Sequence, residues 1–255
     1  MDKTFKTDYA KYYDFFNCKK DYSKEVDFLE KVIEKYGRNP IKSILNLGCG
    51  TGRHDEHLSH RGYNITGLDL SEEMINIALS RNIPAVDFVV GDMTSFNLEK
   101  KYDIAISMFA AFGYLNENIQ IENSLRSINR HLNPQGLLVI EVWNGLGVMK
   151  ELPSSRIKEF SKEEIKIKRQ SFPKLDSLNQ KVEIKFQIEI SKKEKIIDKY
   201  EENHSMRFFF PQEVKYLLNK NGFEMLNLCD TFDLEKKVSE NCWNMVVIAK
   251  KMTDF

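Results

Sequence analysis

Residues 44–69, ILNLGCGTGRHDEHLSHRGYNITGLD, contain the pattern that decides the fold. An apolar run over 44–47 leads into a glycine turn, a polar helical segment and a second apolar run that ends at Asp69. This order predicts a strand, a helix and a second, parallel strand in succession. Gly48, Gly50 and Gly52 allow a sharp turn and bring the backbone against a ligand, where a Cβ would be in the way.

The glycine spacing indicates which ligand the turn accepts. It reads G-x-G-x-G, whereas the dinucleotide fingerprint G-x-G-x-x-G has the extra spacing that opens a helix N-terminus to a pyrophosphate. The tighter turn favours a nucleoside without phosphates, and S-adenosylmethionine is the first candidate. Asp69 lies 21 residues beyond Gly48, at the tip of the second strand, where a carboxylate can bind both ribose hydroxyls.

Alternating strand and helix signals continue along most of the chain. Such alternation predicts a parallel sheet with helices on both faces and ligands at the carboxyl ends of the strands. We therefore expect an α/β fold with a doubly wound, seven-stranded Rossmann-like sheet. The expected strands are 44–47, 64–68, 87–90, 102–107, 137–143, 223–231 and 242–250.

Two segments depart from the alternation. Residues 1–37 have helical periodicity and an aromatic cluster around Tyr13, which predicts a helical lid that packs on the site. Within 150–210, Val182 to Ile190 alternate with charged residues, and 163–170 and 196–210 are further candidate strands, which predicts an inserted antiparallel sheet with one buried face. The expected organisation is a lid, a cofactor-binding core, an inserted substrate sheet and a completion of the core, over 1–37, 38–149, 150–210 and 211–255.

The composition excludes several classes of function. Lys plus Arg equals Asp plus Glu at 38 each, so no global field attracts nucleic acid. The apolar runs are too short to span a bilayer, the N-terminus has no apolar signal region, and the four cysteines form no CxxC pair. We expect a cytoplasmic protein with a small-molecule acceptor, no nucleic acid or membrane partner, and a homodimer as an open alternative.

Four motifs resemble those of class I S-adenosylmethionine-dependent methyltransferases: LNLGCGTG (45–52), GLDLS (67–71), GDM (91–93) and LNPQGLLVIEVW (132–143). Asn46 departs from the acid that many members carry at the end of the first strand. A narrower resemblance, to the amino-sugar N,N-dimethyltransferases, rests on YYDFF, KKDYSKE, SMFAAFGYL, EVW and EENHSMRFFFP. Those enzymes methylate the amine of dTDP-linked 3-amino-dideoxy sugars.

The resemblance implies a set of cofactor contacts. The glycine turn would bind the methionyl group, acids at strand ends would bind the ribose and the adenine amino group, apolar side chains would sandwich the base, and lid tyrosines would close over the methionine tail. The residues in these roles are Gly48, Cys49 and Gly50 (methionyl group), Asp69 (ribose), Asp92 (adenine), Leu70 and Met93 (base), Met108 (sulfonium), and Tyr13 and Tyr22 (tail).

The substrate side is predicted from the lid, the ends of the fourth and fifth strands, and the inserted sheet. The candidate substrate contacts are Tyr13, Tyr114, Trp143, Asn144 and His204. Tyr114 would position the nucleophile, because a phenol is a poor base at neutral pH. His204 is the candidate general base, with an ordinary imidazole pKa near neutrality; a hydrogen-bonded surface histidine, or proton loss to water, is the alternative. Trp143 also fits a core position.

A metal site and a nucleic-acid enzyme are both disfavoured. His54, His57 and His60 cannot converge on one ion, because positions 54 and 60 point about 120° apart on a helix. Residues 150–199 hold 14 Lys and Arg against 9 Asp and Glu, which indicates a solvated sheet face or a basic rim for a diphosphate.

The leading hypothesis is N-methylation of a nucleotide-linked amino sugar. The rivals are methylation of another small amine or hydroxyl, such as an amino acid, and cofactor binding without catalysis.

Overall fold

The computed structural model describes residues 7–38 and 40–254 and contains a seven-stranded core sheet. Along the sheet the strand order is β3-β2-β1-β4-β5-β11-β10; the first five strands are parallel, and β11 runs antiparallel to β5 and β10. The expected α/β class is confirmed. The strands are β1 (Ser43–Leu47), β2 (Asn64–Asp69), β3 (Val86–Val90), β4 (Tyr102–Ser107), β5 (Leu132–Asn144), β10 (Phe223–Asp230) and β11 (Asn244–Lys251).

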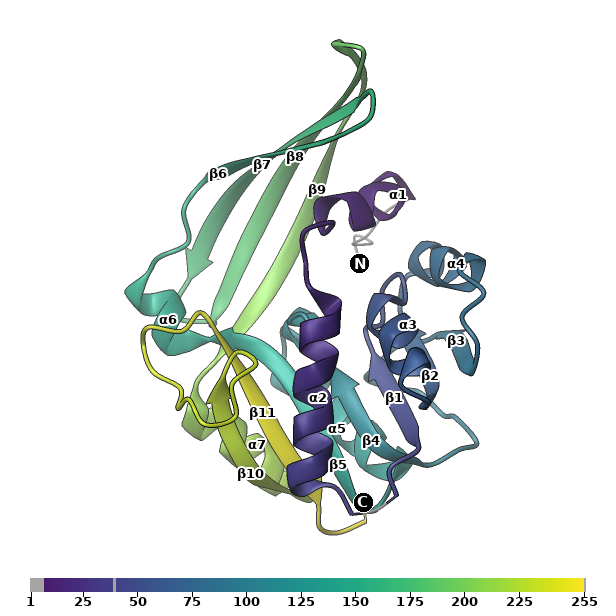
Figure 1. Cartoon of the computed structure of the whole chain (residues 1–255). Helices are drawn as coiled ribbons and strands as arrows, with labels where there is room; N and C mark the ends of the chain where they lie inside the picture. The colour runs from purple at the N-terminus through teal and green to yellow at the C-terminus, as the bar shows by residue number, and fades with distance from the viewer. Residues whose placement is uncertain (1–6, 39, 255) are drawn as a thin grey trace.

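Helices bury both faces of this sheet (Figure 1). On one face, α2 (Tyr22–Tyr36) and α3 (Arg53–His60) pack on alternate apolar side chains of the strands; on the other, α5 (Asn118–His131) and α7 (Pro211–Lys220) do the same. The near-continuous apolar runs of the strands follow from this two-sided burial. A further helix, α4 (Glu72–Ser80), contacts β2 and β3, and Ser71 caps it by accepting a hydrogen bond from the Met74 amide.

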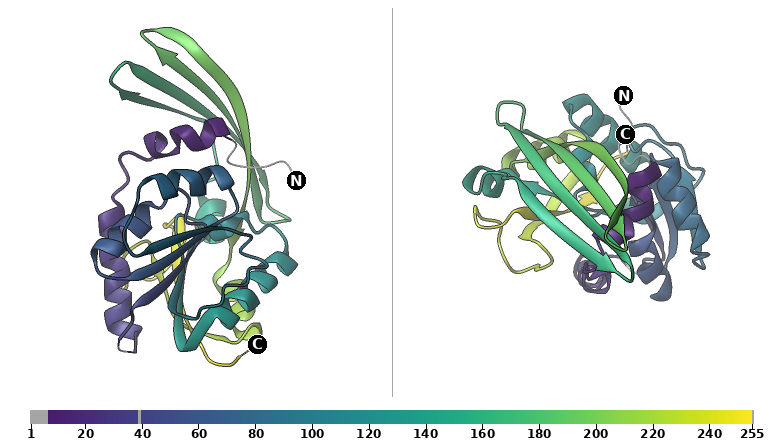
Figure 2. Two further views of the ribbon diagram at one scale, coloured as in Figure 1. Left: turned by 90° about the vertical axis from the view of Figure 1, so that its right-hand side faces the viewer. Right: turned by 90° about the horizontal axis from the view of Figure 1, so that it is seen from above.

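A second sheet stands above the carboxyl ends of the core strands (Figures 1 and 2). Its antiparallel strands are β6 (Arg156–Lys162), β7 (Ile165–Asp176), β8 (Lys181–Lys192) and β9 (Lys195–Phe209), and the short helix α6 (Gly145–Lys150) leads into it. β9 joins the core by pairing Phe208 with Trp143 of β5. The helix α1 (Thr7–Phe16) lies between this sheet and the core, with Tyr9 and Phe16 packed on Ile167 and Ile188.

The sequence expectation and the structure differ in two places. The candidate strand 163–170 begins only at Ile165, because Glu163 has a left-handed backbone (φ 54°) and lies in the turn before β7; β6, ahead of this turn, was not predicted. β5 begins at Leu132 rather than 137, since Leu132 pairs with Tyr102 ahead of the irregular stretch at Gln135. Residues 1–6 of the expected lid lie outside the described residues. No helix in the described ranges is long and apolar enough to cross a membrane.

Candidate functional site

The glycine turn lies between the carboxyl end of β1 and the start of α3. Gly48, Gly50 and Gly52 have φ values of 71°, 56° and 76°, a region that disfavours other residues. The expected close approach is made largely by the chain itself: a Cβ on Gly48 would lie 2.6 Å from Ala111 Cβ, and one on Gly52 would lie 2.7 Å from the Phe88 ring. At Gly50 the nearest atom to such a Cβ, on Tyr13, is 3.9 Å away.

Asp69 lies at the end of β2, beside this turn. Its Oδ2 accepts a hydrogen bond from the Gly50 amide at 2.8 Å, and its Oδ1 accepts one from the Ser71 amide at 2.9 Å. Burial raises the pKa of Asp69, and the backbone donors counteract part of that shift. Each carboxylate oxygen can accept a second hydrogen bond, so the group is oriented to bind a pair of hydroxyls.

Apolar side chains border the turn at the ends of the neighbouring strands. Leu70, after β2, is 70% exposed, and Phe109, after β4, is 43% exposed. The Met93 methyl lies 3.5 Å from the position of a Cβ on Gly48. Asp92 is exposed and accepts a hydrogen bond from the Thr94 amide at 2.8 Å. Met108 does not fit its expected role, because its side chain is 2% exposed and packs in the core on the α2 side.

A buried acid lies beneath the same turn. Both oxygens of Asp55, which is 0% exposed, accept hydrogen bonds from Asn46 Nδ2 at 3.0 and 2.9 Å. Burial raises the pKa of Asp55 to about 7. Burial likewise raises the pKa of the Cys49 thiol well above its ordinary range, so Cys49 is a compact, inert side chain in the turn.

The helix α1 contacts the glycine turn directly. Asp14 accepts a hydrogen bond from Thr51 Oγ1 at 2.6 Å and pairs with the Arg81 guanidinium. The Arg81 Nε also donates to the Thr51 carbonyl at 2.7 Å. Tyr13, from the same helix, lies within electrostatic range of Asp69 and Tyr114. The N-terminal segment therefore covers the turn in this structure.

His54, on α3, has a structural role. His54 Nε2 lies 2.7 Å from Glu25 Oε2, both side chains are buried, and Lys20 pairs with the other Glu25 oxygen. Tyr22, expected over the methionine tail, is buried with its ring edge-on to His54 at 5.0 Å. Within the described ranges, no three His, Cys, Asp or Glu side chains are grouped to hold a metal ion.

Tyr114 and His204 form a hydrogen-bonded pair on the acceptor side. Tyr114 Oη lies 2.6 Å from His204 Nδ1, and His204 Nε2 lies 4.0 Å from Glu202 Oε1. Burial raises the pKa of Tyr114 well above 10, so the phenol keeps its proton. The expected ordinary pKa of His204 is wrong: burial, with Arg169 nearby, lowers it to about 3. At neutral pH this imidazole is uncharged and orients the Tyr114 hydroxyl.

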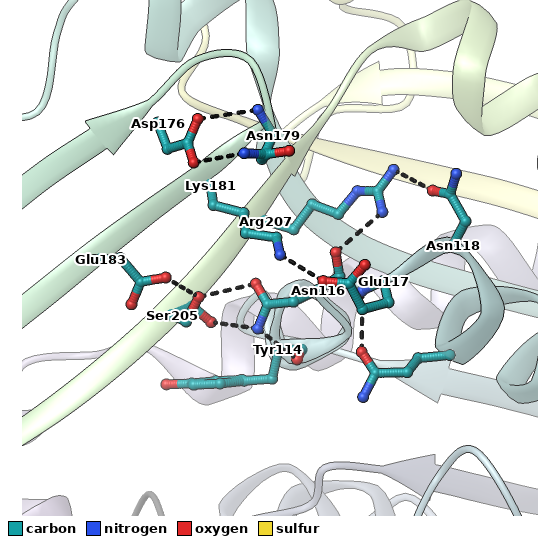
Figure 3. Close-up of polar contacts among 11 residues, drawn as sticks. Tyr114, Asn116, Glu117, Asn118, Asp176, Asn179, Lys181, Glu183, Ser205 and Arg207 are labelled. Atoms are coloured by element: carbon teal, nitrogen blue, oxygen red, sulfur yellow. Dashed lines mark hydrogen bonds and ion pairs between the residues drawn. The ribbon is translucent and has the colours of Figure 1, made fainter. Parts of the chain in front are cut away.

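A polar network fixes Tyr114 against the inserted sheet (Figure 3). The Asn116 amide donates to the Tyr114 and Ser205 carbonyls at 3.2 and 3.3 Å, and Ser205 Oγ donates to Asn116 Oδ1 at 3.0 Å. Arg207 donates to Asn118 at 2.8 Å, and Lys181 pairs with Glu117 at 2.6 Å. These bonds tie the start of α5 to β8 and β9.

Next to the Tyr114–His204 pair, a cavity of about 190 Å³ opens between the inserted sheet and the core. Phe186 lines it and also packs edge-on to His204 at 5.1 Å. Trp143 and Trp243 contribute two rings, 5.7 Å apart in a T-shaped arrangement. Three cations, Arg156, Lys158 and Arg169, line it as well. Burial and the two arginines lower the pKa of Lys158, so the three positive charges lie close together.

Asn144 was expected to contact substrate, but in the structure its side chain has a structural role instead. Its side chain is 0% exposed, donates to the Ser239 and Cys242 carbonyls at 2.8 Å each, and accepts from the Leu146 amide at 3.2 Å as the cap of α6. Trp143 packs with Phe208 and Val182 and also lines the cavity, and its contact with substrate stays a prediction.

Several residues of this region were absent from the sequence prediction. Arg169 donates to Tyr9 Oη at 3.2 Å and lies 4.9 Å from the Phe186 ring centroid. Its position two residues after Ile167 on a strand could have indicated the inward face. The sequence carried no such signal for three other residues. Loop geometry places Phe109 and Trp243, and the register of β6 places Lys158.

Comparisons with known proteins agree with this geometry. Residues 44–136 match the family model of a methyltransferase domain. A dTDP-3-amino-3,4,6-trideoxy-alpha-D-glucopyranose N,N-dimethyltransferase of Streptomyces venezuelae is 34% identical over 142 residues, covering 54% of this chain and 59% of the relative. A malonyl-[acyl-carrier protein] O-methyltransferase of Bacillus anthracis is 32% identical over 158 residues, covering 61% of this chain and 56% of the relative. The chain thus spans somewhat over half the length of each of these relatives.

The solved structures agree on the fold. An S-adenosylmethionine-dependent methyltransferase from Clostridium acetobutylicum ATCC 824 superposes with a TM-score of 0.81 at 19% identity, covering 95% of this chain and 96% of the other. Residues 44–136 therefore match a methyltransferase-domain model, and the chain has the fold of this S-adenosylmethionine-dependent methyltransferase. The resemblance to these methyltransferases, and to amino-sugar N,N-dimethyltransferases among them, is confirmed.

Proposed function

We propose that this protein transfers a methyl group from S-adenosylmethionine to an amine, and that the amine belongs to an amino sugar linked to a nucleotide diphosphate. One observation carries the choice of acceptor: the cavity beside Tyr114 and His204 combines two tryptophan rings with three cations. An aromatic surface suits a nucleobase, and a group of cations suits a diphosphate.

The residues present fit the cofactor. Asp69 has acceptor capacity left for two ribose hydroxyls, and exposed Leu70 and Phe109 provide apolar surface at the strand ends for a purine. Gly48 and Gly50, with Tyr13 above the turn, would hold the methionyl end, and Asp92 is exposed toward solvent for the adenine amino group. When bound, the cofactor supplies a methyl group activated by a sulfonium.

The protein would contribute two further things: it would align the acceptor amine, and it would set the protonation state in which that amine binds. The Tyr114 hydroxyl, held 2.6 Å from His204 Nδ1, would align the amine beside the methyl group. Because the imidazole has its pKa lowered to about 3, His204 is a weak base at neutral pH. We therefore propose that the acceptor binds as the neutral amine and that the proton leaves to water. Alignment alone can contribute roughly 7–11 kcal/mol.

Turnover with matched acceptors tests the proposal. The purified protein and S-adenosylmethionine are incubated with a dTDP-linked 3-amino-dideoxy sugar, with the same amino sugar lacking the nucleotide, with glycine and with a phenol. Mass spectrometry then detects one or two added methyl groups. We expect turnover with the nucleotide sugar and at least tenfold lower kcat/KM without the nucleotide. Preference for glycine, or methylation of the phenol alone, would replace the proposed acceptor with one of the rival classes, and cofactor binding without any turnover would contradict catalysis.

A pair of lysine variants tests the cavity itself. Lys158→Gln removes a charge from the cavity wall, and Lys168→Gln makes the same change on an exposed side chain of the next strand, β7, that does not line the cavity. The KM for the nucleotide sugar should rise about tenfold in the first variant, as expected for a lost charge-assisted contact, and change less than about twofold in the second. Equal effects in both variants would mean that the sheet attracts the substrate through its overall positive charge, without a specific contact in the cavity.

A further inference from the structure

A strained turn connects β4 to the short 3₁₀ helix η1 (Ala111–Tyr114). Phe109 and Ala110 have φ values of 55° and 56°, a left-handed conformation that is unfavourable for residues with a Cβ. Two such residues in succession, neither of them glycine, persist only when the surroundings hold them. Strain of this kind tends to occur at functional sites, so the groups that hold this turn are of interest.

Glu141 is the buried group that holds it. The side chain projects from β5, is 1% exposed, and its Oε2 accepts a hydrogen bond from the Phe109 amide at 2.6 Å. Its Oε1 accepts a second hydrogen bond, from Asn244 Nδ2, also at 2.6 Å. Both oxygens therefore face donors, an arrangement that matches a carboxylate. Burial and the nearby Glu25 carboxylate raise the pKa of Glu141, and Lys20 together with the Phe109 and Asn244 donors opposes part of that shift.

The turn connects the two halves of the candidate site. Ala111, directly after it, packs against the glycine turn so closely that a Cβ on Gly48 would lie 2.6 Å from the Ala111 Cβ. Tyr114, three residues further, makes the 2.6 Å hydrogen bond to His204. The conformation of the turn thus fixes how far the Tyr114 hydroxyl lies from the backbone that would bind the cofactor.

The N-terminal segment also reaches the turn. Lys20 Nζ, from the connection between α1 and α2, lies 4.1 Å from the centroid of the Phe109 ring and pairs with Glu25. A cation over an aromatic face is attractive, so the segment that covers the glycine turn is in contact with the same strained residue.

We infer that Glu141 is a positioning residue for methyl transfer: by holding the strained Phe109–Ala110 turn, it sets Tyr114 at its working distance from the glycine turn. This inference rests on the proposed function. It assigns to Glu141 no contact with cofactor or acceptor; its effect passes through the backbone of the turn.

Glu141→Met tests the inference. It keeps a side chain of similar length but removes both acceptor oxygens, so the Phe109 amide loses its partner and the turn loosens. Hydrogen exchange of the peptide covering 108–116 should accelerate about tenfold or more, as expected for loss of a charge-assisted hydrogen bond. The kcat should fall by a similar factor, with the Kd of S-adenosylhomocysteine within about twofold of wild type. Glu141→Asp, which keeps the charge but shortens the reach, should act in the same direction and replaces the first variant if that one does not fold.

A second substitution separates strain from general stability. Ala110→Gly removes the Cβ that makes the left-handed conformation unfavourable, so adding it to the Glu141 variant should restore slow exchange and most of the kcat. The matched control is Gln135→Gly, which removes the same kind of strain (φ 65°) at the opposite end of β5 and should restore neither.

The outcomes are distinct. Wild-type exchange in the Glu141 variants, absence of rescue by Ala110→Gly, or equal rescue by Gln135→Gly each overturns the inference. If the wild-type protein methylates no acceptor, the proposed function fails, and the exchange measurements alone then decide whether Glu141 holds the turn.

Discussion

Replacing Asp55 by Asn should change how the stability of this protein depends on pH. Asp55 is fully buried in the first turn of α3, and both its oxygens accept hydrogen bonds from the Asn46 amide, at 3.0 and 2.9 Å. Burial raises its pKa from 3.8 to about 7. Folding therefore takes up a proton at Asp55 over the interval between these two values.

The sign and size follow from linkage. Below about pH 4 Asp55 is protonated in both the folded and the unfolded chain and has no effect. As the pH rises toward 7, the unfolded chain loses the proton first, so the free energy of unfolding decreases, and above about pH 7 the decrease is complete. Between pH 5 and pH 8 these pKa values correspond to a loss of roughly 2.5 kcal/mol.

Urea denaturation followed by tryptophan fluorescence at pH 5, 6, 7 and 8 measures the effect. The difference in the free energy of unfolding between Asp55→Asn and wild type should grow in favour of the variant by about 2.5 kcal/mol across this range. An offset that is the same at every pH can come from the new amide, and is set aside by comparing the pH dependence. A difference that stays constant from pH 5 to 8 would refute the reasoning, because Asp55 would then titrate alike in the folded and unfolded states.

Three further outcomes concern the site. Asp69→Ala should weaken binding of S-adenosylhomocysteine by about 1.5–3 kcal/mol in calorimetry, since two charge-assisted contacts are lost; unchanged affinity would remove Asp69 from the cofactor site. His204→Ala should lower kcat by up to about 100-fold through misalignment of Tyr114, with a pH profile from 6 to 9 parallel to that of wild type, because a group with a pKa of about 3 does not titrate there; a wild-type limb near pH 6.5 that the variant lacks would restore the general-base role. Hydrogen exchange over residues 8–22 should slow when cofactor and acceptor are added, and equal protection in both states would contradict the lid.

The fold could be predicted because each core strand carries its signal locally. The runs over 44–47, 64–68 and 102–107 are largely apolar, as burial on both faces requires, and the structure places strands there within a residue or two. The register of β6 against β7 could not be predicted from the sequence. Arg156, Lys158 and Phe160 lie in a charged segment, and only the pairing of β6 with β7 places them on the inward face of the sheet.

The candidate site divides in the same way. Asp69 and the glycine turn belong to one contiguous βαβ unit, so spacing alone indicates their proximity. Tyr114 and His204 lie 90 positions apart and meet only because β9 pairs with the end of β5. Asn144 and Met108 were misassigned for one reason: the end of a strand indicates nearness to the ligand edge, but not whether a side chain points toward the ligand or into the core.

The pKa of His204 follows from the same tertiary contacts. Its ordinary pKa assumed a solvated ring, but Tyr9 and Phe186 pack on it with ring centroids 5.2 and 5.1 Å away. The aromatic cluster of the N-terminal segment thus converts a candidate base into an uncharged hydrogen-bond partner of the Tyr114 hydroxyl. Under the proposed function, the same burial that removes a general base from the site would also favour the uncharged, nucleophilic form of the amine.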